Sequence, residues 1–117
     1  MPIVAGTTPK PTDFFAGFTS DGTSINIPIA DIVGLTAAEA DAANGNGMEL
    51  IHKLLQTVGG AIESTPEADR PANMVYTPGD LDPQVNGQVR VDYNFNFLLD
   101  VDLSNANVQE EAAIAAP

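Results

Sequence analysis

Strict alternation between residues 89 and 103 is the feature that most constrains how this chain folds. Every odd-numbered position in this run is apolar, and every even-numbered position is polar except Leu98. Because successive side chains of a β-strand point to opposite sides, this period of two predicts one long strand with one buried face. At about 3.3 Å per residue, such a strand is longer than a small domain is wide. We therefore expect it to bend or to extend beyond its own domain.

The antiparallel partner of this strand is expected just upstream, at residues 73–77. A loop rich in proline, glycine and aspartate, residues 78–87, separates the two strands. Asp80 and Asp82 of this loop have the carboxylates that a hard cation prefers, but the ligand spacing of an EF-hand is missing. We interpret the loop as a solvated turn.

A second, shorter hairpin is expected near the beginning of the chain. Asp21-Gly22 is a strong turn signal. In residues 24–29, which follow it, isoleucines alternate with polar or proline positions. Pro28 cannot donate a backbone hydrogen bond, which favours an edge strand. An exposed edge is also a place where another chain can dock.

One main helix is expected between the two hairpins. Apolar residues recur at spacings of three and four from Met48 to Ile62, and Asn46 is suited to cap the helix with Glu49 at the third position. Gly59-Gly60 marks either a kink or the close approach of another backbone.

Two shorter helical segments flank the main helix. Thr36 and Glu39 match a capping box, which predicts an alanine-rich helix to about Ala43. Residues 64–67 predict one further turn of helix, which Pro71 ends.

Both ends of the chain are expected to form arms. Residues 1–13 contain several prolines and no sustained period, which predicts an extended N-terminal arm. Residues 104–117 are rich in small residues and form the expected C-terminal arm. The alternative is that the arms fold back onto their own domain. The whole pattern predicts a single α+β domain over residues 14–103, in which a small antiparallel sheet made of both hairpins packs on one main helix.

The charge balance excludes several function classes. The chain has 4 basic and 16 acidic residues and a formal net charge of −12. Binding to nucleic acid or anionic lipid needs clustered lysine and arginine, whereas the basic residues here are dispersed. The chain contains no cysteine, no apolar run of membrane-spanning length and no signal-peptide pattern. We expect no nucleic-acid or membrane partner.

Residues with catalytic or metal-binding chemistry are few. His52 is the only histidine and lacks an obvious nucleophile or orienting partner, so we interpret it as packed at the boundary of the core. Asp92, Asp100 and Asp102 share one face of the long strand. Such an acidic ladder either binds cations weakly, meets basic residues of a partner or is simply solvated. We expect neither an enzyme nor a cofactor.

The central segment carries a resemblance. Residues 25–41 read INIPIADIVGLTAAEAD, and this run resembles a segment of small virion-associated or uncharacterised proteins of marine tailed phages, notably cyanophages. Those proteins similarly continue with a glycine-containing gap, a leucine-rich helix, a Pro-Glu-Ala-Asp-Arg-Pro-like turn and a terminal hairpin. Here this order runs over residues 45–47, 48–62, 66–71 and 73–103.

The resemblance covers residues 14–103 and implies a particle component of the capsid-decorating, or cement, type. Its motifs are structural, and no binding residues are carried over from it. We therefore expect a structural virion protein, made in the host cytoplasm and located on the capsid surface, that bridges neighbouring major capsid subunits. The alternatives are a tail or neck adaptor and a small binding or regulatory module outside the virion.

The expected partner is the major capsid protein or another virion protein, and we also expect a homo-oligomer, either a dimer or a trimer. Contacts are assigned to apolar residues near the expected edge strand and to both arms. These residues are Phe14, Phe15, Ile25, Ile27, Pro28, Lys10 and Ile114. Deletion of residues 1–13 is expected to weaken particle binding and to leave the body folded.

Overall fold

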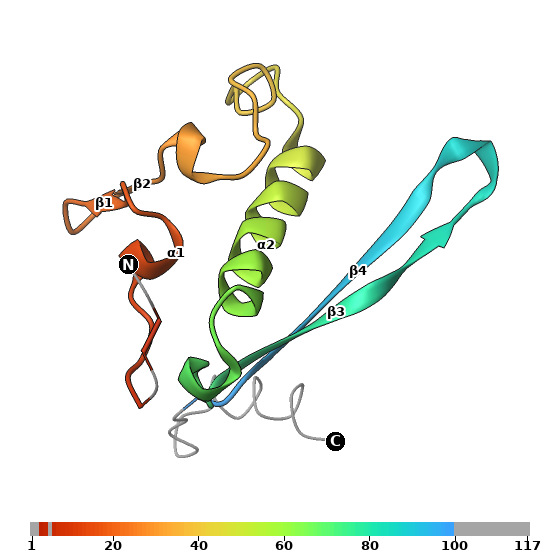
Figure 1. Cartoon of the computed structure of the whole chain (residues 1–117). Helices are drawn as coiled ribbons and strands as arrows, with labels where there is room; N and C mark the ends of the chain where they lie inside the picture. Colours follow the sequence, from red (N-terminus) through yellow and green to blue (C-terminus); the bar gives the residue numbers. More distant parts are fainter. Residues whose placement is uncertain (1–2, 5, 100–117) are drawn as a thin grey trace, which may run out of the picture.

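The computed structural model describes residues 3–4 and 6–99 of the chain. Helix α2 (Gly47–Glu63) lies at the centre, with the N-terminal segments on one side of it (Figure 1). A long hairpin of strands β3 (Met74–Pro83) and β4 (Val89–Phe97) passes the C-terminal end of α2 and projects away from the body. The radius of gyration is 16.7 Å, whereas a compact chain of this length has about 13 Å. The projecting hairpin contributes to this open shape (Figure 1).

Helix α2 confirms the main helix predicted from the sequence. The side chain of Asn46 accepts a hydrogen bond of 3.1 Å from the backbone N–H of Glu49, as expected for the cap. Ile62 is almost fully buried, at 1% exposure, but Met48 and Ile51 are 73% and 55% exposed. The apolar stripe is therefore buried toward the C-terminal end of the helix and exposed at its N-terminal end.

The predicted helix over residues 36–43 is absent, and this segment forms a series of turns. The capping-box hydrogen bonds between Thr36 and Glu39 are nevertheless present, at 3.0 and 3.2 Å. The carboxylate of Asp41 accepts hydrogen bonds from the backbone N–H groups of Ala43 and Asn44. A side chain that binds the backbone in this way competes with helix formation, and a short segment without large apolar side chains gains little from helical packing.

The N-terminal hairpin is confirmed but shorter than predicted. Strands β1 (Thr19–Ser20) and β2 (Ile25–Asn26) pair in antiparallel fashion around the expected Asp-Gly turn. Pro28 lies outside the strand and precedes a 3₁₀ turn (Ile29–Asp31), so the edge strand predicted to run to Ile29 is wrong. The carboxylate of Asp31 accepts a 2.6 Å hydrogen bond from the backbone N–H of Gly17, which holds the chain in this turn.

The C-terminal hairpin differs from its prediction in both strands. Strand β3 continues through Pro78 to Pro83, where a loop was expected, because a bulge between Pro78 and Leu81 absorbs the irregular residues. Strand β4 ends at Phe97, and the part of the predicted strand from residue 100 to 103 lies outside the described residues. The connection contains Asn86 and Gly87, whose φ angles of 71° and 73° suit a tight turn.

The architecture is α+β, as predicted, but the two hairpins do not form one sheet. β1 and β2 make one two-stranded sheet, and β3 and β4 make another. Helix α2 lies between the two, so each hairpin stays on its own side of the helix (Figure 1). This separation overturns the expected single sheet.

The N-terminal segment is attached to the body in its described part. Ile3 is buried, a 3.3 Å backbone hydrogen bond joins Thr7 to Val4, and helix α1 (Pro11–Phe14) lies against α2. This arrangement follows the alternative in which the arm folds back, and the extended conformation expected for residues 1–13 gives way to helix at Pro11. The predicted C-terminal arm, residues 104–117, lies outside the described residues.

The hydrophobic core is small. Its buried apolar residues among those described are Ile3, Phe15, Ile32 and Ile62. Two hydrogen bonds join the segment around Val33 and Gly34 to α2. Thr57 Oγ1 accepts a hydrogen bond of 2.9 Å from the backbone N–H of Val33, and Lys53 Nζ donates one of 3.0 Å to the carbonyl of Gly34. This core therefore surrounds α2 and leaves the distal part of the C-terminal hairpin outside it.

Candidate protein-interaction surface

The base of the long hairpin is fixed to α2 by aromatic side chains. The ring of Tyr76 lies directly over Gly59, so close that a Cβ atom there would be 2.7 Å from the ring. Tyr93 Oη and His52 Nδ1 form a hydrogen bond of 2.9 Å. Phe95 packs on Tyr76 with ring centroids 4.7 Å apart. These contacts position the hairpin relative to the helix.

Burial at this junction affects both tyrosines. Desolvation raises the pKa of Tyr76, with a further contribution from the negative charge of Glu63. Desolvation also raises the pKa of Tyr93, with a smaller effect of the neighbouring Tyr76. Both tyrosine hydroxyls therefore stay protonated at neutral pH.

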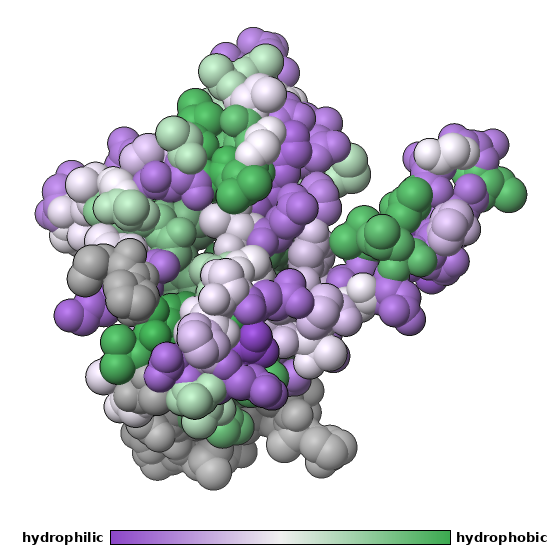
Figure 2. Space-filling model, in the orientation of Figure 1, coloured by the Kyte–Doolittle hydropathy of each residue, from purple (hydrophilic) through white to green (hydrophobic). Residues whose placement is uncertain are grey.

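Beyond the junction the hairpin is exposed on all sides. Residues 77–92 are all exposed, and Val85 at the tip is 81% exposed. Figure 2 shows apolar surface on this projecting part of the molecule. The exposed large apolar residues of the hairpin and its C-terminal flank are Val75, Leu81, Val85, Val89, Val91, Phe97, Leu98 and Leu99. Exposed apolar side chains that gather on a projecting element are typical of a protein-interaction site.

A groove continues this apolar surface onto the helix. It lies between the N-terminal half of α2 and strand β4, and it is lined by Met48, Glu49, His52, Val89 and Val91. The exposed end of the apolar stripe on α2 thus faces the exposed part of β4. Together we call the projecting hairpin and this groove the hairpin surface.

The two edges of the hairpin differ in their hydrogen-bonding capacity. Backbone hydrogen bonds from Leu98 to Asn73 (2.8 Å) and from Gln84 to Gln88 (2.7 Å) bracket the hairpin. Opposed residues of an antiparallel pair alternate between hydrogen-bonded and non-hydrogen-bonded positions. With the observed register, even-numbered residues of β4 bond to β3, and odd-numbered residues direct their N–H and C=O groups to the free edge.

The edge of β3 is interrupted, whereas that of β4 is continuous. Pro78 and Pro83 stand opposite Tyr93 and Val89, at positions whose backbone groups face outward. Proline has no N–H to offer, and the bulge between Pro78 and Leu81 breaks the edge further. Strand β4 has neither proline nor bulge, so it is the edge to which another strand can be added.

The contact residues predicted from the sequence do not gather at one place. Phe15 is buried in the core, and Phe14 is half-buried beside it, with ring centroids 6.5 Å apart. Ile25 is exposed on β2, whereas Ile27 and Pro28 are half-buried. Lys10 is exposed at the start of α1, and Ile114 lies outside the described residues.

The hairpin surface was not among these predictions. The alternation from Val89 onward pointed to β4, but we expected its apolar face to be buried. Leu81 and Val85 were assigned to a solvated loop. The available signal was the presence of two apolar residues, Leu81 and Val85, in a segment otherwise rich in proline, glycine and aspartate. A solvated turn is normally polar, so these two residues indicated another role for the segment.

Several acidic side chains are engaged by nearby groups. Backbone N–H groups of Thr23 and Ser24 donate to the carboxylate of Asp21 and lower its pKa. The hydrogen bond from Lys53, at 2.7 Å, is the main cause of the lowered pKa of Glu39. Within the described ranges, no cluster of three or more histidine and acidic side chains is suited to hold a metal ion.

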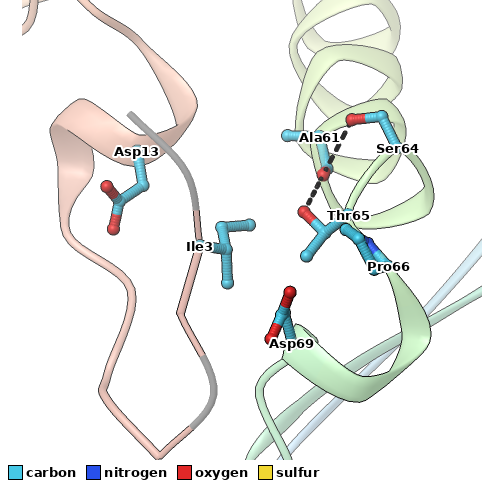
Figure 3. Close-up of a pocket in the computed structure, with 7 residues that line it drawn as sticks. All are labelled: Ile3, Asp13, Ala61, Ser64, Thr65, Pro66 and Asp69. Atoms are coloured by element: carbon cyan, nitrogen blue, oxygen red, sulfur yellow. Dashed lines mark hydrogen bonds between the residues drawn. The ribbon is translucent and has the colours of Figure 1, made fainter.

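A shallow pocket lies on the opposite side of α2, where the N-terminal segment meets the helix (Figure 3). Ile3 and the backbone turn at Thr65 and Pro66 form its walls, and Asp13 and Asp69 lie at its rim. The carboxylate of Asp13 accepts a hydrogen bond from the backbone N–H of Lys10. The hydroxyls of Ser64 and Thr65 both donate to the carbonyl of Ala61 and so are engaged within the helix end. We interpret this pocket as the place where the N-terminal segment packs on the helix.

Comparison with known proteins finds no protein-family model, no curated protein and no solved structure that matches this chain. In the part of the chain that the structure describes, no helix is long and apolar enough to cross a membrane.

Proposed function

We propose that this chain is a structural protein of a virus particle that binds a neighbouring particle protein through the hairpin surface. The observation that carries this proposal is the projecting hairpin, whose apolar residues are exposed from Thr77 to Asp92. A chain with so small a core gains nothing for its own folding from an apolar element held away from the body. The resemblance of residues 25–41 to virion-associated phage proteins supplies the particle context, with the capsid surface as the favoured place.

The proposed mechanism is attachment of a small body by its protruding element. Val85 and Leu81 at the distal end would enter apolar depressions between capsid subunits, while exposed residues of the N-terminal hairpin, such as Ile25, would contact a second subunit. Each contact is small, but two contacts on one body reinforce each other through effective concentration. A symmetric particle repeats this arrangement many times. The net charge of −12 keeps decorated particles mutually repelling.

Washed particles provide the first test. Mass spectrometry of purified virions should detect this chain in a copy number comparable to that of the major capsid subunit. The small copy number of a ring in the tail or neck would favour the adaptor function instead. Absence from washed particles would overturn the proposal.

A matched pair of variants tests the surface itself. Val85→Ser removes the apolar side chain at the hairpin tip and should lower particle occupancy at a given protein concentration about tenfold, as expected for a central apolar contact. Val33→Ser alters another exposed valine, on the body, and is the control. Equal occupancy by both variants would contradict a role of the hairpin tip.

A further inference from the structure

We propose that two copies of this chain associate through the free edges of their β4 strands, forming one four-stranded antiparallel sheet with its two-fold axis at Val91. This pairing goes beyond the proposed function and does not depend on it, because it is a property of the purified chain. The argument rests on the edge, the exposed face and the charges of β4.

The outer edge of β4 has an uninterrupted row of backbone N–H and C=O groups with which a second strand can form hydrogen bonds. Odd-numbered residues from Val89 to Phe97 direct their backbone N–H and C=O groups away from β3. No backbone hydrogen bond to these outward groups is found among the described residues. A second β4 strand running antiparallel presents the same outward groups at the same positions, so the two edges can pair residue by residue.

The exposed face provides a reason for the pairing. A two-stranded hairpin is marginally stable in water, and three or more strands with an apolar face are normally required. Only the base of this hairpin packs on α2, and residues 77–92 are exposed. Pairing of β4 with a second β4 brings both sets of odd-numbered side chains onto one face, with Val89 beside Tyr93 of the second copy.

The charges of β4 select the occupant and the register. With the axis at Val91, Arg90 lies opposite Asp92 of the second copy, and symmetry produces this pair twice. An axis at Asp92 would place two aspartates opposite each other, and an axis at Tyr93 would place Arg90 opposite an asparagine. Arg90 is available for this contact because its side chain is 62% exposed. It also forms an ion pair with Asp82 of the same hairpin, with 3.8 Å between Nη1 and the carboxylate.

The scarcity of basic residues makes this self-complementarity informative. The chain has 4 lysines and arginines in total. Lys53 bonds to Glu39, and Arg70 donates to the carbonyls of Thr65 and Glu63 at the end of α2. Arg90 and Asp92 lie two residues apart on the polar face of β4, one on each side of Val91. A two-fold axis at Val91 therefore places Arg90 of each copy opposite Asp92 of the other.

Cysteine cross-linking tests the register in a chain that has no cysteine of its own. In the proposed sheet, the Cα atoms of the two opposed residues 91 are about 5.5 Å apart, within the range of a disulfide. Val91→Cys should therefore give covalent dimers on mild oxidation of the full-length chain. Val89→Cys is the matched control, because the two residues 89 are separated by about 13 Å along the strands. Absence of Val91→Cys dimers, or equal cross-linking of both variants, would overturn the proposal.

Charge reversal tests the partner by sedimentation of the same full-length chain. Arg90→Asp and Asp92→Arg each place like charges opposite one another twice and should weaken dimerisation about tenfold. The double variant R90D/D92R restores both opposite pairs and should recover dimerisation, whereas Asp82→Asn removes only the carboxylate within the hairpin and should leave it unchanged. A monomeric parent chain at high concentration, or singles that dimerise as well as the parent, would overturn the proposal.

Discussion

At the scale of single residues, the hydrogen bond between Tyr93 and His52 is one of the contacts that join the long hairpin to the helix. It spans 41 positions of the sequence and lies in a half-buried junction with Tyr76. This pair could not be predicted from residue type or from spacing in the sequence. The two side chains belong to different elements, and the relative placement of these elements depends on the whole fold. The sequence supported the boundary position of His52 but not its partner.

Tyr93→Phe removes this hydrogen bond and leaves the ring in place. We expect the free energy of unfolding to fall by about 0.5–1.5 kcal/mol, because His52 Nδ1 loses its partner in a half-buried site. Tyr76→Phe is the control, since the hydroxyl of Tyr76 makes no hydrogen bond to a side chain among the described residues. Urea denaturation followed by circular dichroism measures both, and equal losses would contradict the proposed role of the pair.

Carboxylates with lowered pKa values make stability depend on pH. The pKa of Glu39 in the folded chain lies below its usual value of 4.5, chiefly because Lys53 donates a hydrogen bond to it. Ionised Glu39 therefore stabilises the fold above this usual value, and its contribution is lost as the pH falls through the lower folded-state pKa.

Glu39→Gln should lower the melting temperature at about pH 7. Between about pH 7 and about pH 3, the melting temperature of this variant should fall less than that of the parent chain. Glu67→Gln, at an exposed position in the turn after α2, is the control and should follow the parent chain. Thermal scans across this pH range provide the measurement. Parallel curves for Glu39→Gln and the parent would show that the contact with Lys53 adds no stability.

At the scale of elements, helix α2 shows which signals are local and which are not. Its boundaries follow from the Asn46 cap and the apolar stripe, and the structure agrees with them within one residue. Neither alternative left for Gly59-Gly60 holds: the helix continues without a break, and the group that approaches Gly59 is the ring of Tyr76 and not another backbone. The length of β3 could not be foreseen, because proline and glycine normally end a strand and here occupy outward and bulged positions.

The two glycines of α2 form a natural pair for substitution. Gly59→Ala places a methyl group 2.7 Å from the Tyr76 ring, so it should destabilise the chain by about 1–3 kcal/mol despite the better helix propensity of alanine. Gly60→Ala meets no atom within 4 Å and should stabilise the chain by up to about 1 kcal/mol. Denaturant midpoints separate the two, and a stabilising Gly59→Ala would contradict the close approach.

At the scale of the whole molecule, the described N-terminal segment belongs to the body. Ile3 is 4% exposed, although the prolines around it suggested an arm. A single isoleucine among prolines and threonines carries no period, and its burial depends on a surface made by the distant residues Ala61 to Asp69. Removal of residues 1–13 is therefore expected to destabilise the body, in contrast to the prediction made from the sequence.

Adjacent residues in this segment allow a controlled test. Ile3→Ala removes a buried side chain near the chain end and should cost about 1–3 kcal/mol. Val4→Ala, at a neighbouring exposed position, should change the free energy of unfolding by less than about 0.5 kcal/mol. Equal stabilities of the two variants would show that the segment can leave the body freely.

The interrupted edge of β3 has a consequence for polymerisation. A strand edge that accepts a copy of itself is a hazard, because repeated addition leads to a fibre. Here Pro78 and Pro83 withhold the outward N–H groups on one side of the hairpin. In the proposed four-stranded sheet, the two β4 strands are paired at the centre and the two β3 strands form the outer edges. Because prolines interrupt both outer edges, no further copy can be added there. In the sequence, Pro78 and Pro83 led us to predict a loop in place of β3. In the folded chain, the same two prolines would prevent the pairing of β4 strands from continuing into a fibre.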